Sequence, residues 1–266
     1  MSARSLYPLL AYATLGWRRA VTNLLDLLGN VLLYWVILAI FWGLWSATPL
    51  HELGTEFTQE RLFAYLAVTE WIAFAVGLPY REVEAEIQGG TIDMRLARPI
   101  PFGLATLAIW VGEAACRSVV LASAGVGALL YALGTIPLPM PSGALLLASV
   151  ALSVILVLLW HLQIGLVAAW LGMSAPTFWI WQKLLFVFGG LIMPLTIYPA
   201  GFGAVAKASP FAAMLFAPGS LMLQDGAEHA AWTIGLQLAW LALSILCAVA
   251  VERAAVRRFV EHGTSR

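Results

Sequence analysis

Residues 118–182 form a stretch of 65 positions without a single Asp, Glu, Lys or Arg. A helix needs about 20 apolar residues to cross the hydrocarbon core of a bilayer. This stretch therefore supplies most of two membrane spans, which a turn rich in Gly and Pro at 134–143 divides. The whole chain is 62% apolar and 11% charged, a composition that excludes a soluble globular domain. We predict an all-α integral membrane protein.

The uncharged runs of the chain predict six transmembrane helices. They lie at about 27–50, 62–80, 104–133, 144–170, 177–197 and 230–251. An even number of spans places both termini on one side. The loops and termini of that side carry ten Arg residues, whereas the opposite loops carry only Arg61 and Lys207. Because cytoplasmic loops are enriched in Lys and Arg, we expect cytoplasmic termini and a location in the inner (cytoplasmic) membrane.

Three segments lie outside these spans. In residues 1–23, apolar side chains recur every three or four positions, which predicts an amphipathic helix on the membrane surface. The alternative is a continuation of the first span or a frayed terminus. Residues 81–101 form the most charged part of the chain, on the cytoplasmic side. The segment 198–229 is too apolar for an exposed loop, so we expect it to fold back against the membrane or the bundle.

Three charged residues lie inside the predicted spans, where each costs about 2.5–3.5 kcal/mol to insert. Glu113 and Arg117 are four positions apart on one helix face, so we expect them to pair, either as a structural pair or in contact with substrate. Glu70 has no partner within four residues and needs one on another helix, a wet cavity or a proton. We interpret His161 as a core histidine, and the roles of His161 and Glu70 stay open.

Several kinds of chemistry have no matching motif in the sequence. There is no Walker A motif, no G-x-S-x-G and no H-E-x-x-H, so we expect neither ATP hydrolysis nor another catalytic activity in this chain. Cys116 and Cys247 lack the spacing of metal ligands. The formal net charge of zero argues against nucleic acid as a partner. We therefore expect no cofactor and no metal site.

Two sequence runs and the span pattern together resemble a known family. Residues 86–99 read EIQGGTIDMRLARP, and residues 189–199 at the exit of the fifth span read GGLIMPLTIYP. With six spans and an N-terminal surface helix, these runs resemble the permease subunit of type-2 ABC exporters across essentially the whole chain. The resemblance implies a single transmembrane permease domain over 1–266, in which 198–229 forms two short re-entrant outer helices.

The resemblance also implies partners and functional residues. The loop 81–101 would form a coupling helix that docks on a separate ATPase subunit, which binds ATP and Mg²⁺. The coupling residues would be Glu82, Glu84, Glu86, Ile87, Gly90, Arg95 and Arg98. Two permeases would enclose the translocation path within membrane lipid. The sequence leaves open whether the second permease is an identical copy or a related chain, and which substrate is carried.

Two further expectations complete the sequence-based interpretation. Gly189, Gly190 and Pro194 permit close helix approach, so we expect them at the interface between the two permeases or beside the path. The alternative function is a secondary transporter or channel, in which Glu70, Glu113 and Arg117 would couple transport to ions or protons.

Overall fold

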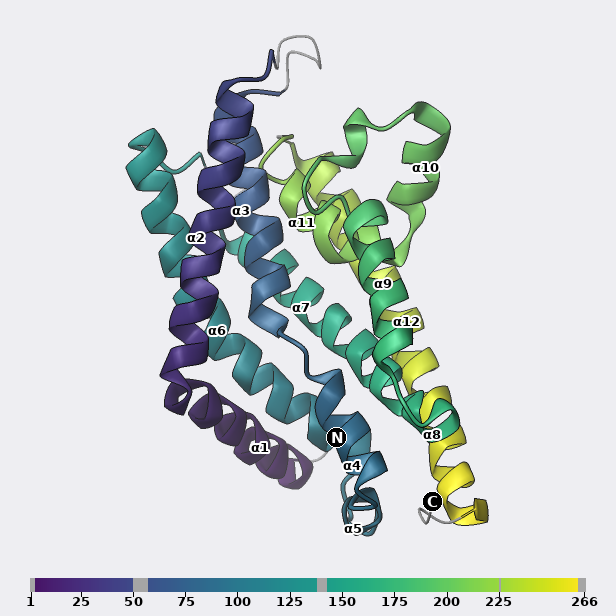
Figure 1. The fold of residues 1–266 in the computed structure, drawn as a ribbon. Coiled ribbons are helices and arrows are strands. Elements are labelled where there is room, and N and C mark those ends of the chain that lie inside the picture. Colours follow the sequence, from purple (N-terminus) through teal and green to yellow (C-terminus); the bar gives the residue numbers. More distant parts are fainter. Residues whose placement is uncertain (1–2, 50–56, 138–142, 225, 263–266) are drawn as a thin grey trace.

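The computed structural model describes residues 3–49, 57–137, 143–224 and 226–262, and these residues form helices and no strand. The prediction of an all-α membrane protein is confirmed, because five helices are long and apolar enough to cross a membrane. These are α2 (Leu24–Ser46), α3 (Gln59–Val76) with α4 (Tyr80–Gln88), α6 (Phe102–Leu133), α7 (Gly143–Leu166) with α8 (Ala168–Leu171), and α12 (Ala227–His262) (Figure 1). The turn residues 138–142, residues 50–56 of the outer loop and Arg266 lie outside the described residues.

The fifth predicted span differs from the prediction. Helix α9 covers only Ala175–Phe188, 14 residues or about 21 Å, and ends at Gly189 and Gly190. Gly190 has φ +64°, a left-handed conformation that ends the helix where hydropathy alone extends it to 197. The chain continues through η2 (Leu195–Ile197), α10 (Ala200–Ala208), η3 (Ala212–Phe216) and α11 (Ala217–Ser220).

The chain still crosses the bundle between α8 and α12. Helix α9 begins beside α8 at the lower end in Figure 1, and α12 begins at the upper end. Helix α9 and the segment after it therefore return the chain across the bundle. Helix α10 and the helical segment Ala212–Ser220 are bent against each other by 80°, as in a broken span or a re-entrant loop. The re-entrant interpretation stays a prediction.

Helix α1 (Ala3–Thr22) lies across the lower end of the bundle, with α4, α5 (Ile92–Leu96) and the last turns of α12 (Figure 1). The chain breaks between α1 and α2 at Asn23, so α1 is a separate helix. Its backbone touches that of α6. A Cβ atom added to Gly16 would lie 1.9 Å from the Ile109 carbonyl oxygen, and one added to Gly112 would lie 1.9 Å from that of Ala13. Glycine is thus required on both helices at this crossing.

Helix α3 forms the centre of the bundle, since 12 of its 18 residues are buried. The outer helices expose leucines instead, and Leu28 and Leu32 of α2 are each 65% exposed, as expected of a lipid-facing surface. A buried polar cluster joins α7, η3 and α12. The Gln237 amide donates to the Ser149 carbonyl (3.0 Å), the Ser153 hydroxyl (2.8 Å) and the Ala213 carbonyl (3.2 Å). The Ser149 hydroxyl donates back to the Gln237 amide oxygen at 2.9 Å.

Candidate functional site

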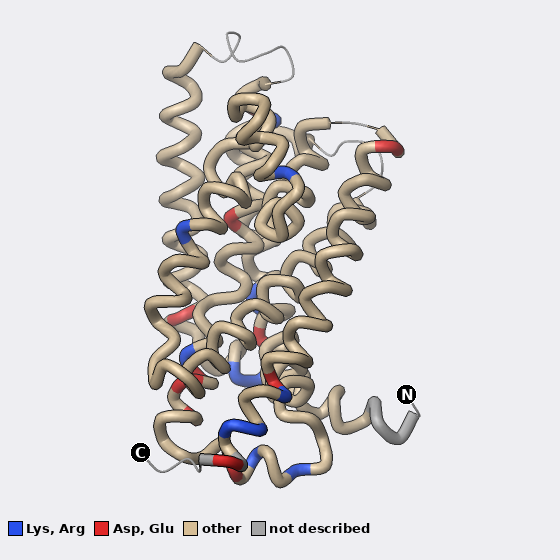
Figure 2. Tube along the Cα trace, turned by 90° about the vertical axis from the view of Figure 1, so that its right-hand side faces the viewer, with Lys and Arg blue, Asp and Glu red and all other residues tan. Residues whose placement is uncertain are grey.

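The charged segment 81–101 folds into a compact pair of short helices, which we call the α4–α5 element (80–96). Residues 77–79 separate α4 from α3, and Gly77 has φ +67°. A second turn separates α4 from α5, where Gly90 has φ +66°. Both turns place glycine in a conformation that other residues rarely adopt. Figure 2 shows that most charged residues of the chain gather at this end of the bundle.

The acidic residues of α4 bind to other parts of the same chain. The Ser174 hydroxyl donates to the Glu84 carboxylate at 2.6 Å, and the Gln88 amide donates to the Gly172 carbonyl at 2.9 Å. These two bonds fasten α4 to the corner between α8 and α9. On the other side, the Trp110 indole of α6 donates to the Glu82 carboxylate at 3.1 Å. Helix α4 is therefore held between α6 and α9.

An internal ion pair closes the α4–α5 element. Arg95 of α5 pairs with Glu86 of α4 at 2.6 Å. The same guanidinium donates to the Thr106 hydroxyl at 2.8 Å and lies 4.6 Å from the centre of the Phe102 ring. Both side chains are about one-quarter exposed or less, so this pair is better shielded from solvent than a surface pair. Glu86 and Arg95 thus fix the shape of the element.

The free surface of the α4–α5 element comes from other residues. Met94 is 69% exposed. Arg81 at the start of the element and Arg98, two residues after it, are also exposed, whereas Ile87 is partly buried against the core. Of the predicted coupling residues, Arg98 and Glu82 keep substantial exposure. Sequence reasoning missed Met94, although an apolar residue inside a charged run is itself a signal for a contact surface.

Glu113 and Arg117 do not pair as the sequence suggests. Arg117 pairs with Asp26 of α2 at 2.9 Å, and Glu113 pairs with Arg19 of α1 at 3.7 Å. Arg19 also lies 3.9 Å from Glu82 of α4. Packing of α1 and α2 against α6 offers each charge a partner on another helix. These pairs tie α1, α2, α4 and α6 together.

Arg117 also stabilises the break between α3 and α4. Its guanidinium donates to the Val76 carbonyl at 3.4 Å, at the last residue of α3. A Cβ atom on Gly77 would lie 2.5 Å from the Arg117 Nη1 atom. The end of a helix leaves carbonyl oxygens without partners inside the helix, and a cation there satisfies one of them. Arg117 is thus a positioning residue for the α3–α4 break.

One comparison with known proteins decides the family. The model of the family described as ABC-2 family transporter protein matches residues 58–263, more than three-quarters of the chain. This chain belongs to the ABC-2 transporter family. The match begins at the start of α3 and covers the α4–α5 element, α9 and the segment up to α12. The curated proteins contain no match to the sequence. As an ABC-2 transporter protein, the chain is a multi-pass membrane permease of an ABC transporter and is not itself the catalytic component.

Glu70 and His161 of this ABC-2 transporter protein are both buried. Glu70 lies midway along α3 and forms no hydrogen bond or ion pair with the described residues. The His161 ring makes edge contacts with the Tyr80, Phe178 and Trp181 rings at centroid distances of 5.0–5.9 Å. It is a core histidine in an aromatic cluster. Among the described residues, no group of three His, Cys, Asp or Glu could hold a metal ion.

The glycines after α9 pack inside the chain. A Cβ on Gly189 would lie 3.1 Å from the Leu215 side chain, and one on Gly190 would lie 2.9 Å from the Tyr65 hydroxyl. The Tyr65 hydroxyl donates to the Gly190 carbonyl, and the Thr69 hydroxyl donates to the Leu191 carbonyl at 3.0 Å. Close approach to η3 accounts for Gly189, and close approach to α3 accounts for Gly190, both within one chain. Pro194 is buried beside them. Their place at a permease–permease interface or beside the path stays a prediction.

Proposed function

We propose that this chain is the permease subunit of an ABC exporter that works with a separate ATPase subunit. The ATPase binds ATP and Mg²⁺ and docks on the α4–α5 element. A second permease, identical or related, completes the translocation path. The proposal rests on one observation. The charged α4–α5 element is hydrogen-bonded directly to α6 and to the base of α9.

The distribution of arginine supports a cytoplasmic docking site. The described ends of the chain and the α4–α5 element share one end of the bundle, and Lys and Arg residues are concentrated there (Figure 2). The opposite end carries Arg61 and Lys207. Cytoplasmic loops are enriched in Lys and Arg, so with this chain in the inner membrane the α4–α5 element faces the cytoplasm. ATP is present on that side.

The pairing of the intramembrane charges favours this function over ion-coupled transport. Glu113 and Arg117 are each neutralised by an oppositely charged partner in this structure. A proton or ion carrier needs charged groups that can change partners along a path. Of the three intramembrane charges, only Glu70 could still serve ion-coupled transport. A single buried acid supports that function less than the α4–α5 element supports ATPase docking.

The test is a double substitution at two exposed residues, Met94 in the element and Arg98 just after it. We expect Met94→Asp combined with Arg98→Glu to reduce co-purification of the ATPase and its stimulation by the permease at least fivefold. Apolar anchors supply most of an interface's affinity and charges fix its register, so changing both removes affinity and orientation. Neither side chain is buried, so the bundle should still fold and insert.

The control is Arg257→Glu, which reverses an exposed arginine of α12 at the same end of the bundle. It should leave ATPase retention and stimulation near the wild-type value. Glu84→Lys is unsuitable as a test of docking, because it breaks the bond to Ser174. Wild-type retention and stimulation in the Met94/Arg98 variant would place the ATPase contact elsewhere.

A further inference from the structure

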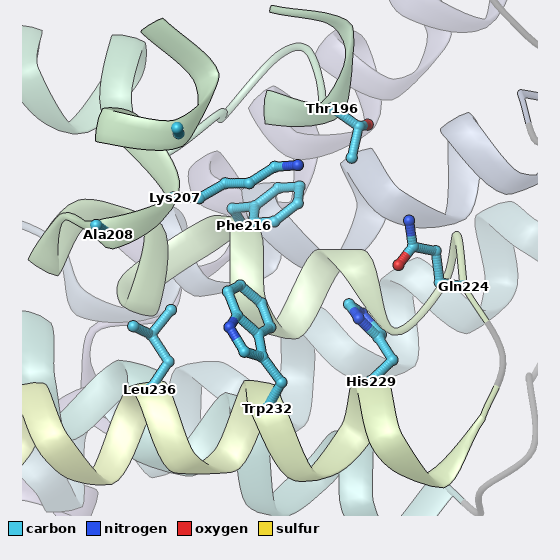
Figure 3. Close-up of a pocket in the computed structure, with 9 residues that line it drawn as sticks. Thr196, Lys207, Ala208, Phe216, Gln224, His229, Trp232 and Leu236 are labelled. Atoms are coloured by element: carbon cyan, nitrogen blue, oxygen red, sulfur yellow. The ribbon is translucent and has the colours of Figure 1, made fainter. Parts of the chain in front are cut away.

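A cavity of about 530 Å³ opens at the end of the bundle opposite the α4–α5 element, between α10, η3 and the first turns of α12. Figure 3 shows Lys207, Phe216, His229 and Trp232 around it, and the ammonium group of Lys207 and the amide of Gln224 point toward the same space. A volume of this size suits a small organic ligand. No interaction described above uses this cavity.

The polar groups of the cavity favour an anion. Lys207 is one of only two lysines in the chain, and its Nζ atom lies 5.9 Å from the centre of the Phe216 ring. No carboxylate in the described part of the chain forms an ion pair with it. His229 is already held, because its Nε2 atom lies 2.9 Å from the Ser220 hydroxyl and its ring stacks on Trp232. The cavity thus offers, beside aromatic rings, an ammonium group that no carboxylate of the described residues pairs with.

The cavity also changes from polar to apolar along α12. His229 lines the end near the start of α12, and Leu236 lies seven residues further along. Seven helical residues span about 10 Å, and α12 runs from this end of the bundle toward the other. Ala208 also lines the cavity and lies on the same side as Leu236 (Figure 3). A ligand that fills the cavity would place a charged group at the surface and an apolar part about 10 Å deeper.

We propose that this cavity binds an anionic phospholipid of the outer leaflet. Lys207 neutralises the phosphate, Gln224 donates to it, and Trp232 packs on the glycerol region. The start of one acyl chain lies along Ala208 and Leu236. A lone ammonium group is a common phosphate partner, and an indole ring suits the boundary between headgroups and hydrocarbon. The site lies at the opposite end of the bundle from the proposed ATPase contact, so it stands apart from the proposed function.

The experiment measures lipid binding to the full-length chain, purified and delipidated, by native mass spectrometry. The probes are dihexanoyl phosphatidic acid, dihexanoyl phosphatidylcholine and inorganic phosphate. Phosphatidic acid should bind at least tenfold more tightly than either of the others, because only it combines net charge with acyl chains. Lys207→Gln should weaken phosphatidic acid binding about tenfold, a loss typical of a charge-assisted hydrogen bond.

Two further variants and a control separate charge from shape. Lys207→Arg should retain affinity within about threefold, whereas Ala208→Trp should weaken binding by filling the apolar end while the cation remains. The control is Lys183→Gln, which removes the other lysine, in α9, and should change nothing. Each variant is first checked for a wild-type elution volume and melting temperature.

Three results would overturn the proposal. Unchanged affinity for phosphatidic acid in Lys207→Gln would exclude the cation from the site. Equal binding of phosphatidylcholine would remove the requirement for net charge. Binding of inorganic phosphate as tight as that of phosphatidic acid would show an anion site without a lipid chain. The titration needs neither ATP nor the ATPase, so it stands or falls independently of the α4–α5 element.

Discussion

Removing Arg117 tests which partner it uses. At 2.9 Å and an effective dielectric constant of about 20, Arg117 and Asp26 attract each other by about 6 kcal/mol before desolvation is subtracted. The two side chains are 17% and 39% exposed, so desolvation and solvent screening offset most of that attraction. We expect a net coupling of about 1–2 kcal/mol between Asp26 and Arg117.

The alternative partner, Glu113, predicts a smaller value. A Glu and an Arg four residues apart on one helix couple by about 0.3–0.5 kcal/mol. Two double-mutant cycles compare the two pairs: Asp26→Asn with Arg117→Gln, and Glu113→Gln with Arg117→Gln. Unfolding is followed by circular dichroism as SDS is added to mixed micelles. A larger coupling in the Glu113 cycle, or none in the Asp26 cycle, would refute the assignment.

Two further changes test the packing of the bundle. Gln237→Leu removes four hydrogen bonds at about 0.6 kcal/mol each within a membrane, so the free energy of SDS unfolding should fall by about 2 kcal/mol; an unchanged midpoint would contradict the cluster. Gly112→Val should push α1 away from α6, because a side chain there meets the Ala13 carbonyl, and spin labels on the two helices should move apart. Gly127→Val on the same helix, with no neighbour within 4 Å, is the control; equal spin-label distances in both variants would count against the close contact.

The helices themselves follow closely from hydropathy. The sequence predicts spans at 104–133 and 144–170, and the structure has α6 at Phe102–Leu133 and the α7–α8 helices at Gly143–Leu171. This agreement has a physical basis, because a backbone in lipid must satisfy its hydrogen bonds internally and so forms a helix wherever the chain is apolar. Helix α9 departs from the prediction because hydropathy does not register backbone conformation. Gly190, with its left-handed φ, ends the helix inside an apolar run.

The contacts of the charged residues could not be predicted from spacing. Ser174 follows Glu84 by 90 positions, and Asp26 precedes Arg117 by 91, so only the packed bundle brings them together. Neighbours on one helix are visible in a sequence, whereas partners on different helices depend on crossing angles and register. The sequence therefore identifies the charged segment but does not show that Glu84 and Glu86 bind inside the chain. Their part in coupling to an ATPase stays a prediction.

The fastening of α4 to the α8–α9 corner determines how a push on the α4–α5 element spreads through the permease. Helix α9 is held at its far end, where the Tyr65 hydroxyl of α3 binds the Gly190 carbonyl, and at its base, where Ser174 binds Glu84. A helix that is held at one end and pulled at the other rotates about the held end. Motion of α4 would therefore rotate the base of α9 about Gly190. The break at Gly77 separates α3 from α4, so α3 would stay in place during this motion.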